Sequence, residues 1–273
     1  MRALLAALLL TGCGASLGDP PAGEGAGGDD GSDRGSPLSC EHVDVLLAVD
    51  NSGSTQKEQL ALIGAFPGFS SQLRDVAGLA DFRVGLVDGC AQSASLHTRG
   101  MTGPCNFAGG HAWMESSSPS LVVELACVAN IDSRDALCRG NDDDEQPVST
   151  AAAALEPTWS GAGTPNAGFS RADALLVVVA ITDEDEHPIP SASARQLYDR
   201  LVAAKGSSNV LFVGFGGESN CEGPYGSADD AEKLQDVTSL FAAKRRGVFW
   251  DLCGGQLDQG LRKAVAALDA ACE

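Results

Sequence analysis

The sequence predicts an α/β fold in which a doubly wound, mostly parallel central sheet is flanked by helices. Residues 42–49 (HVDVLLAV) and 174–181 (ALLVVVAI) are apolar runs of strand length, typical of strands buried on both faces of a parallel sheet. Strand-like and helix-like segments alternate along the chain, as crossover connections between parallel strands require. Apolar residues make up 44% of the chain and aromatic ones only 5%, so we expect an aliphatic core.

The spacing of apolar residues assigns the other elements. A helix is expected over residues 56–76, although Pro67 and Gly68 should end or kink it midway. Further helices are expected over 120–129, 146–155, 192–204, 228–243 and 256–271, and further strands over 82–87, 112–114, 209–215 and 247–251. The strand at 112–114 should be a short edge strand. The long segment between Asp88 and Ser118 should be rich in loops that shape specificity.

The charge of the chain excludes some classes of partner. There are 37 acidic and 18 basic residues, which gives a net charge of -19. Such a surface repels phosphate backbones and anionic headgroups, so we expect no nucleic-acid binding and no membrane contact except through an anchor. Solubility alone would also account for the excess of acid.

The N-terminus has the pattern of an export signal. Arg2 is followed by an apolar stretch that is too short to span a bilayer, and then by Leu10-Thr11-Gly12-Cys13. The last four residues resemble the bacterial lipobox, which implies cleavage, acylation of Cys13 and anchoring in the cell envelope. Because Gly14 follows the cysteine, the resemblance favours the outer membrane. The alternative is an ordinary secretory signal with an incidental cysteine.

The chain therefore divides into three parts: a signal peptide with its lipobox (1–13), a flexible tether rich in Gly, Asp and Pro (14–38) and one folded domain (39–273). The domain has about 235 residues, which suits a single large core.

Eight cysteines remain beyond Cys13, an even number that indicates disulfides in an exported protein. The sequence contains no Cys-x-x-Cys pair that would suggest a metal site. Proximity in the sequence favours Cys90 with Cys105 and Cys127 with Cys138. A bond between Cys40 and Cys272 would join the ends of the domain, and Cys221 with Cys253 is then left by elimination.

Acidic and hydroxyl side chains follow the two strongest predicted strands. The first strand is followed by Asp50-Asn51-Ser52-Gly53-Ser54, and the second by Thr182 and Asp183. Ligands of open α/β sheets bind beyond the carboxyl ends of the strands. Asp50, Ser52 and Ser54 can turn a carboxylate and two hydroxyls toward one point, and such oxygen ligands suit one Mg²⁺ or Mn²⁺ ion.

Helix initiation is the alternative explanation of this loop. Thr55 and Glu58 have the spacing of a capping box, and both explanations can hold together. For Asp185 and Glu186 we favour an ordinary solvated loop over a ligand role.

These motifs resemble the von Willebrand factor type A family, whose metal-ion-dependent adhesion site combines Asp-x-Ser-x-Ser after the first strand with a later aspartate. Asp50, Ser52, Ser54 and Asp183 match that pattern, and the resemblance extends over most of the segment between Cys40 and Cys272. It implies a fold of that kind and a divalent cation at these residues.

The family's threonine ligand has no counterpart here. It should lie just before the helix at 146–155, where the chain reads Asn141-Asp142-Asp143-Asp144-Glu145. Either Glu145 or one of the aspartates 142–144 replaces it, or the site is altered. A carboxylate in place of a hydroxyl would hold the cation more tightly and leave it less attractive to an acidic partner.

The resemblance implies a surface-anchored, cation-dependent protein-binding module and no enzyme, because in the family a partner protein completes the cation's coordination with its own carboxylate. One alternative is a secreted hydrolase in which Asp50, Asp183 and Asp185 hold a metal that activates water. Another is a structural envelope lipoprotein with a vestigial metal site. The histidines give the hydrolase no support, because they are scattered at His42, His97, His111 and His187.

Overall fold

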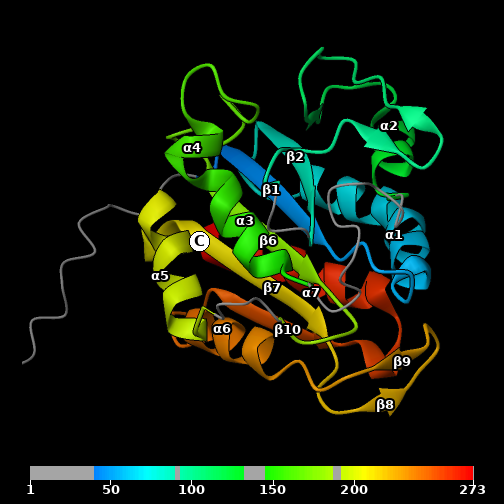
Figure 1. Ribbon diagram of the computed structural model, residues 1–273. Coiled ribbons are helices and arrows are strands. Elements are labelled where there is room, and N and C mark those ends of the chain that lie inside the picture. The colour runs from blue at the N-terminus through cyan, green and yellow to red at the C-terminus, as the bar shows by residue number, and fades with distance from the viewer. Residues whose placement is uncertain (1–39, 90–92, 132–144, 187–191, 273) are drawn as a thin grey trace, which may run out of the picture. The chain divides into compact units, whose positions relative to one another are not determined.

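The computed structural model describes residues 40–89, 93–131, 145–186 and 192–272, which all belong to one compact unit, Asp33–Glu273. Its centre is a six-stranded sheet with the order β10-β7-β6-β1-β2-β5 (Figure 1). The strands are β1 (His42–Val49), β2 (Asp81–Asp88), β5 (Met114–Glu115), β6 (Leu175–Ile181), β7 (Val210–Gly216) and β10 (Gly247–Asp251). All pairs are parallel except the edge pair of β2 with β5. The predicted fold class is confirmed.

Helices cover both faces of this sheet, as Figure 1 shows. One face carries α1 (Gln56–Arg74), α2 (Leu121–Val128) and α7 (Leu257–Cys272), and the other carries α3 (Pro147–Leu155), α5 (Ala194–Lys205) and α6 (Glu232–Ala242). Alternate residues of β1 pack against the two helix layers: Val45 and Leu47 pack in the core beneath α1, α2 and α7, and Leu46 and Ala48 pack in the core beneath α3, α5 and α6. Both central strands are thus buried on two faces, which explains their apolar runs.

Short elements complete the chain. They are β3 (Arg99–Gly100), β4 (Gly103–Pro104), α4 (Pro157–Ser160), η1 (Ser207–Asn209), β8 (Cys221–Glu222), β9 (Ser227–Ala228) and η2 (Leu252–Gly254). Among the described residues, no helix is both long and apolar enough to cross a membrane.

The strand order reverses between β1 and β6. From this pair, β2 and β5 extend in one direction and β7 and β10 in the other. Val49 pairs with Ile181 in the parallel register, and the backbone N–H of Asp50 donates to the carbonyl of Ile181 at 2.9 Å. The loops that follow these two strands therefore leave the sheet side by side at the reversal point, where open α/β sheets bind ligands.

Helix α1 runs through Pro67 without ending, so of the two predicted effects of Pro67 and Gly68, an end or a kink, the end is wrong. Leu62, Phe66, Phe69 and Leu73 are all buried in one core cluster. We attribute the continuous helix to this packing, which offsets the backbone hydrogen bond that proline cannot donate.

Three disulfides join described residues: Cys40–Cys272, Cys105–Cys127 and Cys221–Cys253. The first and third agree with the predicted pairs. The predicted bonds Cys90–Cys105 and Cys127–Cys138 are wrong, because the structure pairs Cys105 with Cys127, joining the end of β4 to α2. Cys90 and Cys138 lie outside the described residues. Disulfides are typical of proteins exported to an oxidising compartment.

A buried ion pair lies at the amino end of the sheet. Asp44 on β1 is fully buried, and it accepts hydrogen bonds from the Arg171 backbone N–H at 2.6 Å and from the Arg171 Nε at 2.8 Å. Arg171 also pairs with Asp81 at the start of β2. One guanidinium therefore compensates carboxylates from two neighbouring strands.

We expect Arg171→Met to lower the free energy of unfolding by about 3 kcal/mol, because it leaves the Asp44 carboxylate buried without its counter-charge. Arg195→Met is the matched control: Arg195 pairs with Asp199 at the surface, and its loss should cost less than about 1 kcal/mol. Urea unfolding of both variants measures the difference. Equal losses would mean that Arg171 does not compensate a buried charge.

Candidate functional site

The loop after β1 is ordered by hydrogen bonds around Asp50, which is 0% exposed. The backbone N–H of Ser52 donates to Asp50 Oδ1 at 2.7 Å, and the hydroxyls of Ser52 and Ser54 lie 2.7 Å apart. Thr55 donates its hydroxyl to the backbone carbonyls of Asp50 and Ser52, each at 3.0 Å. The predicted capping box is therefore not formed, because the Thr55 hydroxyl closes the loop and no side chain caps α1.

The loop after β6 meets this loop directly. The hydroxyl of Thr182 donates to Asp50 Oδ2 at 2.9 Å, and the hydroxyl of Ser54 hydrogen-bonds the carboxylate of Asp183. Asp183 is 4% exposed, and its Oδ1 has no hydrogen-bond partner. The structure thus brings together Asp50, Ser52, Ser54 and Asp183, as the motif predicts.

Glu145 approaches from the segment before α3. It is 4% exposed, its Oε2 has no hydrogen-bond partner, and its carboxyl hydrogen-bonds that of Glu184. The end of β2 fixes this segment, because the backbone N–H of Gln146 donates to the carbonyl of Gly89 at 2.9 Å. Residues 142–144, the other candidates for the missing ligand, lie outside the described residues.

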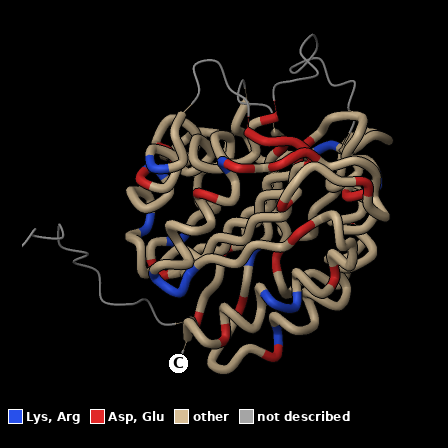
Figure 2. Tube along the Cα trace, turned by 90° about the horizontal axis from the view of Figure 1, so that it is seen from below, with Lys and Arg blue, Asp and Glu red and all other residues tan. Residues whose placement is uncertain are grey.

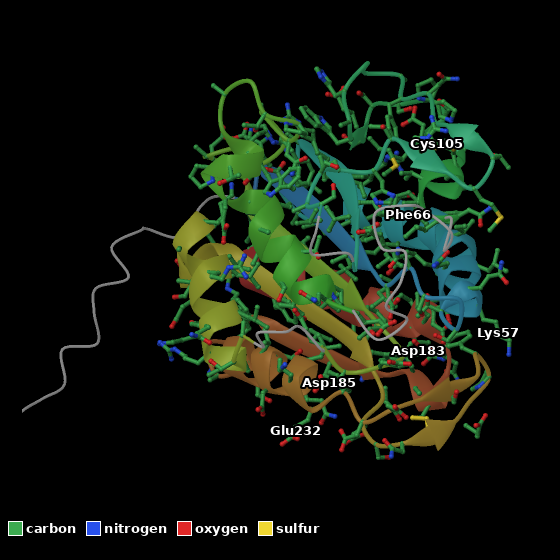
Figure 3. The ribbon with its side chains drawn as sticks, in the orientation of Figure 1. Lys57, Phe66, Cys105, Asp183, Asp185 and Glu232 are labelled. Carbon is green, nitrogen blue, oxygen red and sulfur yellow. A yellow bond between two sulfur atoms is a disulfide. The ribbon has the colours of Figure 1, made fainter. Side chains whose placement is uncertain are left out.

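Asp185 and Glu186 serve neighbouring helices. Asp185 Oδ1 accepts from the backbone N–H of Lys233 in the first turn of α6, and the two carboxylate oxygens of Glu186 accept from Val148 and Ser149 at the start of α3. Both are caps supplied from another part of the chain. The favoured solvated-loop interpretation is wrong for Glu186, which is buried. Figure 3 shows Asp183 and Asp185 at the same end of the molecule as Glu232 of α6.

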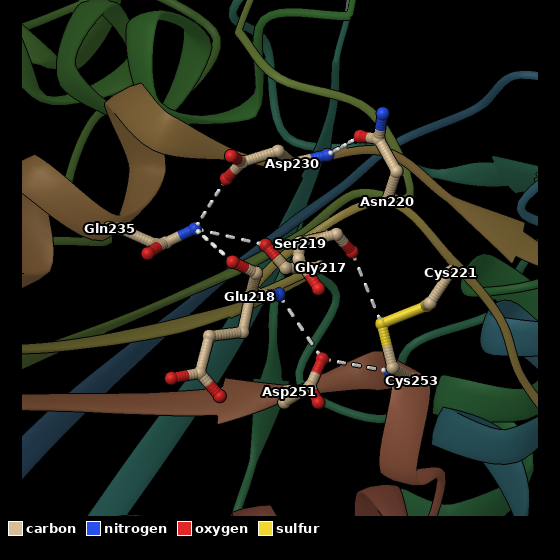
Figure 4. The surroundings of a disulfide bond; sticks show 9 residues. All are labelled: Gly217, Glu218, Ser219, Asn220, Cys221, Asp230, Gln235, Asp251 and Cys253. Atoms are coloured by element: carbon tan, nitrogen blue, oxygen red, sulfur yellow. Dashed lines mark hydrogen bonds between the residues drawn. A yellow bond between two sulfur atoms is a disulfide. The ribbon is translucent and has the colours of Figure 1, made fainter.

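The loop after β7 contacts the loop after β6. The backbone N–H of Asp229 donates to the carbonyl of Asp183 at 2.8 Å. As Figure 4 shows, Asp251 accepts from the backbone N–H groups of Glu218 and Cys253, beside the Cys221–Cys253 disulfide. This loop is therefore attached to both the β6 loop and η2.

Burial, with the charges of neighbouring carboxylates, raises the pKa of four acidic side chains in this region: Asp50, Glu58, Glu145 and Asp183. We call Asp50, Glu58, Glu145, Asp183 and Glu184 the acidic cluster. Burial, reinforced by the charge of Asp183, raises the pKa of Asp50 to about 7. Burial and the charges of Asp183 and Asp50 likewise raise the pKa of Glu58 to about 7. The pKa of Glu145 is raised by burial and by Asp50 and Glu184, and that of Asp183 by burial and by Glu184. The full chain has 37 acidic and 18 basic residues, and Figure 2 marks where those of the described part lie.

Two members of the acidic cluster, Glu58 and Glu184, were not predicted as site residues. The capping-box spacing offered another explanation for Glu58, and Glu184 had no pattern of its own.

In the described part of the chain, no three His, Cys, Asp or Glu side chains are arranged as a complete metal site. His97 pairs with Asp88 at 2.9 Å and His42 with Asp81 at 3.0 Å, so these histidines are engaged elsewhere. His187 lies outside the described residues.

Comparison with known proteins gives only distant similarities. No protein-family model matches the chain, and neither does any curated protein sequence. Among solved structures, proximal thread matrix protein 1 from the mussel byssus is 12% identical with a TM-score of 0.47, covering 86% of this chain and 49% of that one. The manganese-loaded TRAP protein of Plasmodium vivax is 13% identical with a TM-score of 0.41, covering 86% and 75%.

The pilus adhesin SpaC of Lactobacillus rhamnosus GG, in its open conformation, is 11% identical with a TM-score of 0.44, covering 85% of this chain and 30% of that one. This chain thus spans about half of the byssus protein and less than a third of the adhesin. Similarities of this size assign neither a family nor a function.

The raised pKa values predict that the cation-free protein loses stability as the pH rises. Asp50 and Glu58 ionise near pH 4 in the unfolded chain but near pH 7 in the folded one, so the folded state binds more protons between these values. We expect the melting temperature in a chelator to fall from about pH 5 to about pH 8. The fall should be smaller in Asp50→Asn. A stability that rises over this range would contradict the assignment of these buried carboxylates.

Proposed function

We propose that this protein is an exported, cation-dependent protein-binding module of the von Willebrand factor type A kind. One observation carries the proposal: the Asp50-x-Ser52-x-Ser54 loop contacts the Asp183 loop where the strand order reverses. Neutral hydroxyls and carboxylates from two loops are the oxygen ligands that Mg²⁺ and Mn²⁺ prefer.

The chemistry of the site fits a divalent cation. Asp183 Oδ1 and Glu145 Oε2 are buried without hydrogen-bond partners, although carboxylate oxygens out of water normally accept hydrogen bonds or bind a cation. Asp50, Ser52, Ser54 and Asp183 would hold the cation, with Glu145 replacing the family's threonine. The described residues contain no group of three or more His, Cys, Asp or Glu side chains arranged to hold a metal, and the proposed ligand set includes the hydroxyls of Ser52 and Ser54.

In the proposed function the described residues of the site orient one another and would hold the cation. Thr182 fixes the Asp50 carboxylate, and Thr55 and Gln59 hold the Asp50 backbone carbonyl, so the loop is rigid before any partner arrives. A bound cation would supply an open coordination position for a carboxylate of a partner protein. The hydrolase alternative is weakened because the Asp185 carboxylate caps α6.

We expect calorimetric titration to show one Mn²⁺ or Mg²⁺ bound by the wild-type protein and none by Asp50→Asn, which removes the buried charge at constant size. Asp199→Asn is the matched control, because it makes the same change in the exposed pair with Arg195 and should leave binding intact. If the wild-type protein binds neither ion, the proposed function is wrong, and the alternative of a structural envelope lipoprotein with a vestigial metal site is favoured.

We also propose that the protein is anchored to the cell envelope, and specifically to the outer membrane, by lipid on Cys13, a residue outside the described part of the chain. Cells fed a labelled fatty acid should label the wild-type protein and fail to label Cys13→Ser. Equal labelling of both would place any acylation elsewhere, and no labelling of either would indicate an ordinary secretory signal.

A further inference from the structure

Glu58 is a buried carboxylate that the adhesion-site pattern does not use. It lies in the first turn of α1, is 1% exposed, and its Oε2 has no hydrogen-bond partner. A charge removed from water without a partner is costly. The backbone N–H of Glu58 itself hydrogen-bonds the carboxylate and favours its charged form, but Thr55 forms no capping box with it, because the Thr55 hydroxyl is engaged with the backbone of the β1 loop, and Oε2 keeps no partner.

The charges around Glu58 are those of the candidate cation site. Asp183 and Asp50 both act on its carboxylate, and both are negative. The neighbouring positive charge, Lys57, is exposed and extends from the surface (Figure 3), where solvent screens it. Gln59 binds the carbonyl of Asp50 at 3.1 Å and accepts from the N–H of Ile131 at 3.2 Å, which fixes this turn of α1 against the β1 loop.

We infer that Glu58 is a positioning residue of the proposed cation site, contributing its negative charge from the first turn of α1. This inference rests on the proposed cation-binding function. It explains the buried, unpartnered oxygen, because a cation beside Asp50 and Asp183 would offset all three carboxylates at once.

Glu58→Gln tests this inference, since it removes the charge while keeping the size of the side chain. We expect Mn²⁺ affinity, measured by calorimetry on the intact protein, to fall about 10- to 100-fold, as is typical when an outer-shell partner of a metal site is changed. Glu232→Gln is the matched control: it makes the same change at an exposed position in the first turn of α6, and its affinity should equal that of the wild type.

Melting temperature separates this role from a merely structural one. In a chelator at about pH 8, Glu58→Gln should melt at or above the wild-type temperature, because an uncompensated buried charge is gone. With Mn²⁺ added, it should gain less stability than the wild type. A structural residue would instead lower the melting temperature under both conditions.

The outcomes are distinguishable. If the wild type binds Mn²⁺, Asp50→Asn does not, and Glu58→Gln binds as the wild type does, the inference about Glu58 is overturned while the proposed function stands. If the wild type binds no cation, both are overturned.

Discussion

The compensation of buried negative charge at the carboxyl ends of β1 and β6 is the constraint on which the site depends. The parallel register of these strands places Asp50 beside Thr182, and both are fully buried. Moving Asp50 and Asp183 apart would break the central ladder, so the two carboxylates stay close, and the charge of Asp183 adds to burial in raising the pKa of Asp50. Hydrogen bonds from Ser52 and Thr182 stabilise the ionised Asp50 carboxylate, and in the proposed function a bound cation would offset the remaining charge.

The four acidic residues that follow β6 have two different roles: two of them cap helices, and the other two belong to the acidic cluster. In the loop after β6, Glu186 and Asp185 turn toward the first turns of α3 and α6, where backbone N–H groups donate hydrogen bonds to their carboxylates. Asp183 and Glu184 belong to the acidic cluster instead. The two caps fix the loop from outside, so the Asp183 carboxylate is held in place by helices on the opposite face of the sheet from α1.

Much of this arrangement is predictable from sequence because it depends on the burial of whole strands. The apolar runs 42–49 and 174–181 can only be central strands, so Asp50 and Asp183 had to meet at one edge. The disulfide of Cys105 was not predictable by the same means, since proximity along the chain pointed to Cys90, whereas the fold places α2 and Cys127 beside β4. The helix through Pro67 likewise depends on packing that no local rule contains.

Glu58 illustrates a different limit. Its spacing from Thr55 fits a capping box, and sequence alone does not specify which way a carboxylate in a first turn points. The structure shows no capping box, because the Thr55 hydroxyl is engaged with the backbone carbonyls of the preceding loop.

The distribution of charge within the site bears on what it can bind. Asp50, Glu58, Glu145 and Asp183 lie on the buried side, whereas Ser54 is exposed and Ser52 half-buried. A cation in this position would be surrounded by carboxylates toward the protein and by neutral hydroxyls toward the solvent. Its attraction for a partner's oxygen would then be weakest toward the interior and strongest at the serines. If Glu145 takes the place of the family's threonine in the proposed site, its charge on the protected side would favour retention of the cation and weaken the attraction of that cation for an acidic partner.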